Sequence, residues 1–165
     1  VCRNMPQDNS KITEIQFSNA EFLPKVVELL NEGHTVTLRL RGVSMRPFLE
    51  DNRDKALLTK PVSPKIGDPV LAEIWKGHFV LHRIVNIEGD NVTLLGDGNL
   101  SCEHCKLENI VGAVIGFYRK NRDTLDYTNG NKWKIYSYIW MHLYPIRRYL
   151  LAAYRRIWLR IFKTK

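Results

Sequence analysis

The chain has 165 residues, which suits one domain with an appendage, and its 44% hydrophobic content is ordinary for a protein with a packed core. The net charge of +8 is concentrated at one end: all 17 acidic residues lie at or before Asp126, whereas residues 127–165 hold nine Lys and Arg side chains and no acid. This distribution excludes a uniformly basic protein and restricts any surface for an acidic partner to the C-terminal tail.

The N-terminal segment, residues 1–33, contains one expected helix that ends near Gly33, a natural residue for that position. An amphipathic stripe predicts it: Phe22, Val26, Leu29 and Leu30. Residues 1–16 are polar and lack the apolar centre of a secretory signal peptide, and no long apolar run precedes Ser44. We therefore expect no N-terminal transmembrane anchor, and a cytoplasmic or peripheral membrane location.

Short strands separated by turns dominate the middle of the chain. Runs rich in β-branched and aromatic residues predict strands at residues 35–40, 56–58, 69–75, 79–87, 92–95 and 110–117. Turn signals occur at Lys76-Gly77 and at Glu88-Gly89-Asp90. Residues 120–131 are polar and are predicted to form a linker. We therefore expect a mainly β domain over residues 34–119, with helices flanking it.

The tail, residues 132–165, is basic and rich in aromatic residues, and Pro145 divides it into two expected helices. In the second helix apolar side chains fall on one side and arginines on the other, as in helices that lie in a membrane interface. The residues expected to contact a membrane surface are Trp133, Trp140, Arg148, Arg155, Arg156 and Trp158. Packing of the two helices on the domain, or on a second subunit, is the alternative. We expect no nucleic-acid partner, since no recognition motif is present.

Ser44 and His82 carry the strongest chemical signal. Ser44 follows the strand predicted at residues 35–40, and His82 lies inside the strand predicted at 79–87. A serine hydroxyl becomes a good nucleophile when a nearby base takes its proton, and histidine is the usual base because its pKa lies near neutral pH. The pair therefore indicates acyl transfer. His78, on the same predicted strand face as His82, is the alternative base.

Four motifs follow one another in a fixed order: Ser44-Met45-Arg46-Pro47, then Lys65-Ile66-Gly67-Asp68-Pro69-Val70, then His82-Arg83, and finally Gly96-Asp97-Gly98-Asn99. In this order they resemble the signal peptidase I family, within the clan that includes LexA-type self-cleaving repressors, and the resemblance spans roughly residues 34–118. The histidine followed by arginine is similar to the Ser/His form of endoplasmic-reticulum and archaeal signal peptidases, whereas the bacterial form has a lysine base.

The resemblance implies a signal peptidase/LexA-like β-fold and a serine endopeptidase, which needs neither a metal nor another cofactor. Its substrates would be peptide or leader sequences with small residues near the cut. Ser44 would be the nucleophile and His82 the base. The family has a second acid six residues after the aspartate of its Gly-Asp-x-Asn segment, where this chain has Glu103, so Asp97 and Glu103 both stay open as the acid that orients His82.

Other residues would support the reaction. The Ser44 main-chain N–H would bind the oxyanion, and the residues expected to support or line the site are Gly42, Met45 and Pro47. A degenerate peptidase fold that binds peptides at the membrane is the alternative function, although a pure binder has no need of a Ser/His pair. Cys102 and Cys105 have the spacing of a redox pair or of half a zinc site, but a structural zinc site needs four ligands, so we expect two reduced cysteines.

Overall fold

The computed structural model describes residues 19–158 and 160, and the predictions for residues 1–18 and for the Trp158 side chain lie outside the described part. The strands are β1 (Val36–Arg39), β2 (Lys55–Thr59), β3 (Pro69–Trp75), β4 (His78–Glu88), β5 (Asn91–Leu95), β6 (Glu103–Lys106), β7 (Ile110–Tyr118) and β8 (Leu125–Tyr127). The helices are α1 (Asn19–Asn31), α2 (Asn131–His142) and α3 (Arg147–Ala153), with 3₁₀ turns at Leu107–Asn109 and Tyr144–Ile146 and a π-helical turn at Tyr154–Trp158. The predicted class, mainly β with flanking helices, is confirmed.

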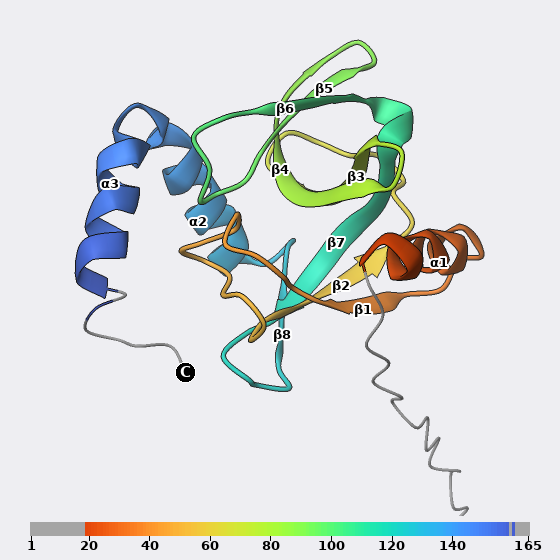
Figure 1. Cartoon of the computed structure of the whole chain (residues 1–165), viewed down its shortest axis with the longest axis horizontal. Helices are drawn as coiled ribbons and strands as arrows, with labels where there is room; N and C mark the ends of the chain where they lie inside the picture. Colours follow the sequence, from red (N-terminus) through yellow and green to blue (C-terminus); the bar gives the residue numbers. More distant parts are fainter. Residues whose placement is uncertain (1–18, 159, 161–165) are drawn as a thin grey trace, which may run out of the picture.

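The described strands form one antiparallel sheet in the order β1-β2-β7-β3-β4-β5-β6, and β8 pairs with β7. The register shifts within four of the strand pairs: β2–β7, β3–β4, β3–β7 and β4–β5. Such irregularities bend strands and increase their twist. The sheet accordingly curls, with α1 at one side of it and α2 and α3 at the other (Figure 1).

Two clusters of buried apolar side chains form the core. The larger cluster draws on α1, the segment after β1, strands β2, β3 and β7, and α2; its buried members are Leu23, Val26, Leu30, Leu40, Met45, Phe48, Leu49, Ala56, Leu58, Leu71, Val114, Phe117 and Trp133. The smaller cluster lies among β3, β4, β5 and β7; its members are Val70, Ala72, Ile84, Val92, Leu94 and Ile110. Because α1 and α2 contribute to the same cluster, both helices belong to the β domain.

The helix predicted near the N-terminus is confirmed as α1. Val26 and Leu30 are buried on its inner face. Leu30 packs closely on β7, since a Cβ atom added to Gly112 would lie 3.0 Å from Leu30 Cδ1. After the helix Gly33 adopts a φ of 90°, which glycine tolerates best, and its N–H donates to the Leu30 carbonyl at 3.1 Å.

The linker predicted at residues 120–131 is wrong. Strand β8 lies within that segment and pairs with β7, and α2 begins at Asn131. The tail therefore continues the domain directly. Pro145 does separate two helices, but it lies in the short 3₁₀ turn, and α3 starts two residues later at Arg147. Across residues 19–158 and 160, no helix is both long and apolar enough to cross a membrane.

Candidate active site

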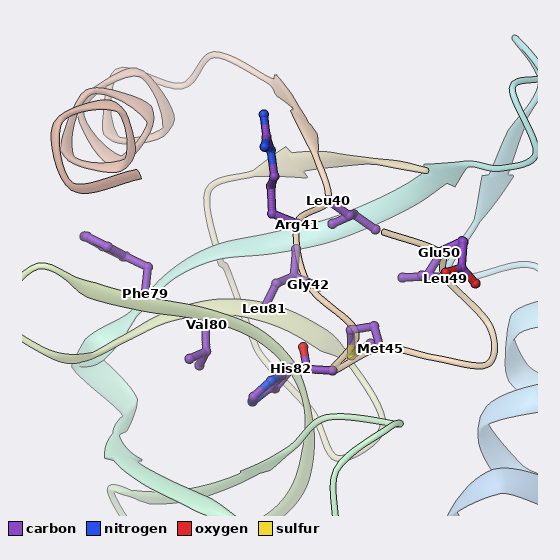
Figure 2. A pocket seen from close by; sticks show the side chains of 11 residues that line it. Leu40, Arg41, Gly42, Met45, Leu49, Glu50, Phe79, Val80, Leu81 and His82 are labelled. Carbon is purple, nitrogen blue, oxygen red and sulfur yellow. The ribbon is translucent and has the colours of Figure 1, made fainter. Parts of the chain in front are cut away.

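A cavity of about 130 Å³ lies between the segment that follows β1 and the first half of β4. The residues that line it are Leu40, Arg41, Gly42, Ser44, Met45, Leu49, Glu50, Phe79, Val80, Leu81 and His82. Figure 2 shows Val80 and His82 on one side of β4 and Phe79 and Leu81 on the other. The fold thus brings Ser44 and His82 to one cavity, together with Gly42 and Met45, whereas Pro47 is half-buried and does not line it.

The loop that carries Ser44 is fixed at both ends. At its start, Gly42 has a φ of 94°, and its N–H donates to Asp51 Oδ1 at 2.7 Å. At its end, the buried Leu49 donates its N–H to the Met45 carbonyl at 3.0 Å. Space is open beside Gly42, since no atom lies within 4 Å of an added Cβ. Glycine therefore supplies the backbone turn and leaves the cavity unobstructed at this point.

The turn at Gly96-Asp97-Gly98 packs directly on the Ser44 loop. The Gly98 N–H donates to the Ser44 carbonyl at 2.7 Å. A Cβ atom on Gly96 would lie 2.5 Å from the Ser44 carbonyl oxygen and 3.0 Å from His82 Nε2, and one on Gly98 would lie 2.5 Å from the Val43 carbonyl oxygen. These spacings are too short for any side chain. Both glycines thus permit the close approach of the Ser44 backbone and the His82 ring, a role that the sequence does not reveal beyond a turn signature.

His82 is paired with Glu103: its Nδ1 atom lies 2.7 Å from Glu103 Oε2. Neither atom has another hydrogen-bond partner in the described part of the chain. A carboxylate only accepts hydrogen bonds, so a neutral imidazole in this contact carries its proton on Nδ1 and leaves Nε2 as an acceptor. Burial lowers the pKa of His82, against the opposing effect of the Glu103 charge. The neutral form is therefore favoured at neutral pH.

The strand register explains why Glu103 reaches His82. Leu94 of β5 pairs with Ile84 of β4 on one side and with Glu103 of β6 on the other, so these three residues share one face of the sheet. His82 lies two residues before Ile84 and points to the same face, because side chains alternate along a strand. Arg83, in between, points to the opposite face.

Asp97 is buried on that opposite face and pairs with Arg83. Arg83 Nε donates to Asp97 Oδ1 at 2.9 Å, and Arg83 Nη2 donates to Asp97 Oδ2 at 2.7 Å. The Tyr136 hydroxyl donates to Asp97 Oδ2 at 2.8 Å, and Trp140 Nε1 donates to the Asp97 carbonyl at 3.1 Å. Burial, and next the negative charge of Asp97, raise the pKa of Tyr136. Of the two acids that the sequence offers, only Glu103 contacts His82, and Asp97 ties the glycine turn to α2.

Two of the residues expected to contact a membrane lie inside the domain. Trp133 is 4% exposed and packs on Phe48 and Phe117, with ring centroids 5.0 and 5.1 Å apart. Trp140 is 8% exposed. The expectation is wrong for both because this aromatic face of α2 covers the sheet. The three arginines of the expected set are exposed: Arg148, Arg155 and Arg156.

Within residues 19–158 and 160, no three His, Cys, Asp or Glu side chains are grouped so that they could hold a metal ion. Cys102 and Cys105 are free thiols, and burial raises the pKa of Cys105. In comparisons with known proteins, no protein-family model and no curated protein matches this chain. A proposal for its chemistry therefore depends on the site geometry and on the motifs of the sequence.

Proposed function

We propose that the chain is a serine endopeptidase of the signal-peptidase type, with a signal peptidase/LexA-like form of the mainly β fold. The observation that carries the proposal is the arrangement around His82: one ring nitrogen contacts Glu103, and the other lies beside the glycine turn on which the Ser44 backbone also packs. A histidine oriented by a carboxylate and placed beside a serine is the arrangement that activates a hydroxyl for acyl transfer.

The proposed mechanism uses these groups in turn. As the Ser44 hydroxyl attacks a peptide carbonyl, His82 Nε2 takes its proton, and the Glu103 carboxylate stabilises the imidazolium that forms. The Ser44 main-chain N–H stabilises the oxyanion. His82 then gives the proton to the leaving amine, and the peptide bond breaks. A water molecule activated by His82 hydrolyses the acyl-enzyme and restores Ser44.

Strand edges beside the cavity support an extended peptide as the substrate. Among the described strands, β1 pairs only with β2, and the part of β4 before Arg83 pairs only with β3. Both segments lead into the cavity lining. A peptide that adds to such an edge gains main-chain hydrogen bonds and presents alternate side chains to the protein. A peptide could therefore lie across the cavity with a carbonyl near Ser44.

We also propose that the outer face of α2 lies on an anionic membrane surface. Ile135 and Tyr138 on this face are 60% and 66% exposed, and Ile139 beside them is exposed as well. The segment after Asp126 has no acidic residue. Apolar side chains with surrounding cations suit the boundary between anionic headgroups and acyl chains. The protein would then be a peripheral membrane protein.

Vesicle sedimentation tests this surface. We expect binding to phosphatidylglycerol vesicles, much weaker binding to phosphatidylcholine vesicles, and at least a fivefold loss for Ile139→Glu. Val62→Glu is the matched control, because Val62 is 90% exposed and lies outside α2. Equal binding by Ile139→Glu and the wild type would contradict the proposed surface.

The enzymatic proposal is tested by covalent labelling with a fluorophosphonate, a reagent that reacts with activated serines. We expect a single adduct, mapped to Ser44 by mass spectrometry, that is absent in Ser44→Ala and strongly reduced in His82→Ala. Thermal unfolding of each variant serves as the control for folding. A folded wild-type protein that takes up no label, with or without vesicles, would contradict the proposal and favour a fold that only binds peptides.

A further inference from the structure

We propose that Cys102 and Cys105 form a redox site: oxidation joins them in a disulfide, and this bond removes Glu103 from His82. Both thiols are free, and Glu103 lies between them in the chain. The change in structure concerns β6 alone, whereas its effect on catalysis rests on the proposed endopeptidase function.

The extended form of β6 keeps the two thiols apart. A disulfide needs Cα atoms about 4.4–6.8 Å apart. The two residues between the cysteines, Glu103 and His104, both belong to β6. Because a strand advances about 3.4 Å per residue, the cysteine Cα atoms lie roughly 10 Å apart, and their side chains point to opposite faces. The disulfide can therefore form only if Glu103 and His104 leave the extended conformation.

Glu103 loses its contact with His82 when the strand bends in this way. In the reduced protein Glu103 pairs with Leu94 of β5, and this pairing holds the carboxylate 2.7 Å from His82 Nδ1. A bend at Glu103 breaks the pairing and redirects the side chain. The oxidised protein thus keeps Ser44 and His82 but lacks the carboxylate that orients the imidazole.

Strand β6 lies where such a change costs little. It has four residues, lies at the end of the strand order, and pairs only with β5 among the described strands. None of its four side chains is fully buried. Segments with few buried contacts open locally at a small fraction of the free energy of global unfolding. A disulfide that forms at the expense of strand pairing is also readily reduced, so the change is reversible.

A low-molecular-weight disulfide, such as oxidised glutathione, supplies the oxidising equivalents. Cys102 reacts first because it is exposed, whereas burial raises the pKa of Cys105 and lowers its thiolate fraction. The Cys102 thiolate attacks one sulfur of oxidised glutathione and releases one glutathione thiol. When β6 opens, the Cys105 thiolate attacks the Cys102 sulfur and releases the second. The protein loses two electrons and two protons, and the two glutathione molecules carry them away.

Treatment of the whole folded chain with oxidised glutathione tests the proposal. Cys2→Ser serves as the parent, so that Cys102 and Cys105 are its only cysteines. We expect mass spectrometry to find a disulfide between them, and amide hydrogen exchange to become faster over β6 but not over β3. Fluorophosphonate labelling of Ser44 should slow about a hundredfold, the low end of the contribution of a general base. Dithiothreitol should restore it.

Cys105→Ala in this parent is the matched control, because Cys102 can then carry glutathione but cannot form the internal disulfide. Its labelling rate should not change, and equal slowing in it would overturn the proposal. A folded parent that forms no disulfide, or forms one without faster exchange over β6, would also overturn it. Equal labelling of the oxidised and reduced parent would do the same and leave the endopeptidase proposal standing. If the reduced parent takes up no label, the endopeptidase proposal fails, and the disulfide and the exchange over β6 decide the redox site.

Discussion

His82 and Arg83 are neighbours in β4, yet each pairs with a different acid on a different face of the sheet. His82 contacts Glu103 of β6, the strand that follows β4 and β5 in the sheet. Arg83 meets Asp97 in the turn that follows β5. Strand alternation alone separates the two pairs. The same dipeptide thus supplies a titratable group to the cavity side and a permanent cation to the interior.

The two pairs differ in burial, and this difference separates their tasks. The side chains of Arg83 and Asp97 are each 1% exposed, and further hydrogen bonds from α2 hold Asp97. The Glu103 side chain is 32% exposed, and among the described residues its Oε2 atom has no partner other than His82. The buried Arg83–Asp97 pair, whose hydrogen bonds are all made, holds the structure in place. His82 can gain and lose a proton beside the partly exposed Glu103 carboxylate, and this pair therefore suits proton transfer.

The largest expected effect is on activity, from removal of His82. We expect His82→Ala to slow Ser44 labelling on the order of 10⁴-fold, because a general base contributes up to that amount. His78→Ala is the matched control. His78 lies four residues before His82 on the same face of β4, and its ring stacks on Trp75 instead of contacting Glu103. Similar losses for both variants would show that the effect is not specific to the His82–Glu103 pair.

Removal of Asp97 should have the largest effect on stability. Asp97→Ala leaves the Arg83 guanidinium buried without its carboxylate, so we expect a loss of about 3–5 kcal/mol in the free energy of unfolding by urea. Glu103→Ala should cost less, about 1–3 kcal/mol, because it leaves only the neutral, buried His82 N–H without its acceptor. Comparable losses from the two substitutions would remove the distinction between a structural and a reactive pair.

Glu103→Gln sharpens the comparison on the reactive side. The amide keeps the size of the side chain and removes its charge, so His82 loses the carboxylate that stabilises its protonated form. We expect Ser44 labelling to slow about a hundredfold, the low end of the contribution of a general base, because His82 itself is still present. Since the Glu103 charge raises the pKa of His82, the pH profile should also shift to lower pH. Glu108→Gln, at an exposed carboxylate, should change neither quantity.

The smallest effect concerns the hydrogen bond from α2 to Asp97. Tyr136→Phe removes the hydroxyl that donates to Asp97 Oδ2, and we expect a loss of about 1.5 kcal/mol in stability, as is usual for hydrogen bonds to charged groups. Tyr138→Phe, on the exposed face of the same helix, should be neutral. Equal stability of both variants would mean that α2 does not hold the glycine turn in this way.

Much of the fold is predictable from the sequence, because most strands either alternate apolar and polar side chains or are rich in apolar residues. The strand predicted at residues 69–75 coincides with β3. Strand β6, Glu103–Lys106, has no apolar pattern and is held at the edge of the sheet by pairing with β5. The three-residue β8 is shorter than any pattern that sequence reasoning can read. A strand that forms because it pairs with its neighbour, and not because of its own side-chain pattern, cannot be predicted from the sequence.

The same limit applies to the site. Its nucleophile and base are visible as motifs, but the choice between Asp97 and Glu103 depends on the β5–β6 register, which cannot be derived without β6. The steric role of Gly96 depends on a contact with a distant loop. For Trp133 and Trp140, an aromatic stripe indicates only that something covers it, and a bilayer and a β-sheet are equally apolar covers.

The pH dependence of Ser44 labelling, measured beside the titration of the His82 ring by NMR, tests the central claim that neutral His82 activates Ser44. Burial lowers the pKa of His82 below its ordinary value of 6.5, so the labelling rate should rise with pH through a single midpoint below 6.5 and stay constant at neutral pH. The NMR midpoint of His82 should coincide with it. A labelling rate that does not change between acidic and neutral pH would contradict the claim. A midpoint of the rate that differs from the midpoint of the His82 titration would contradict it as well.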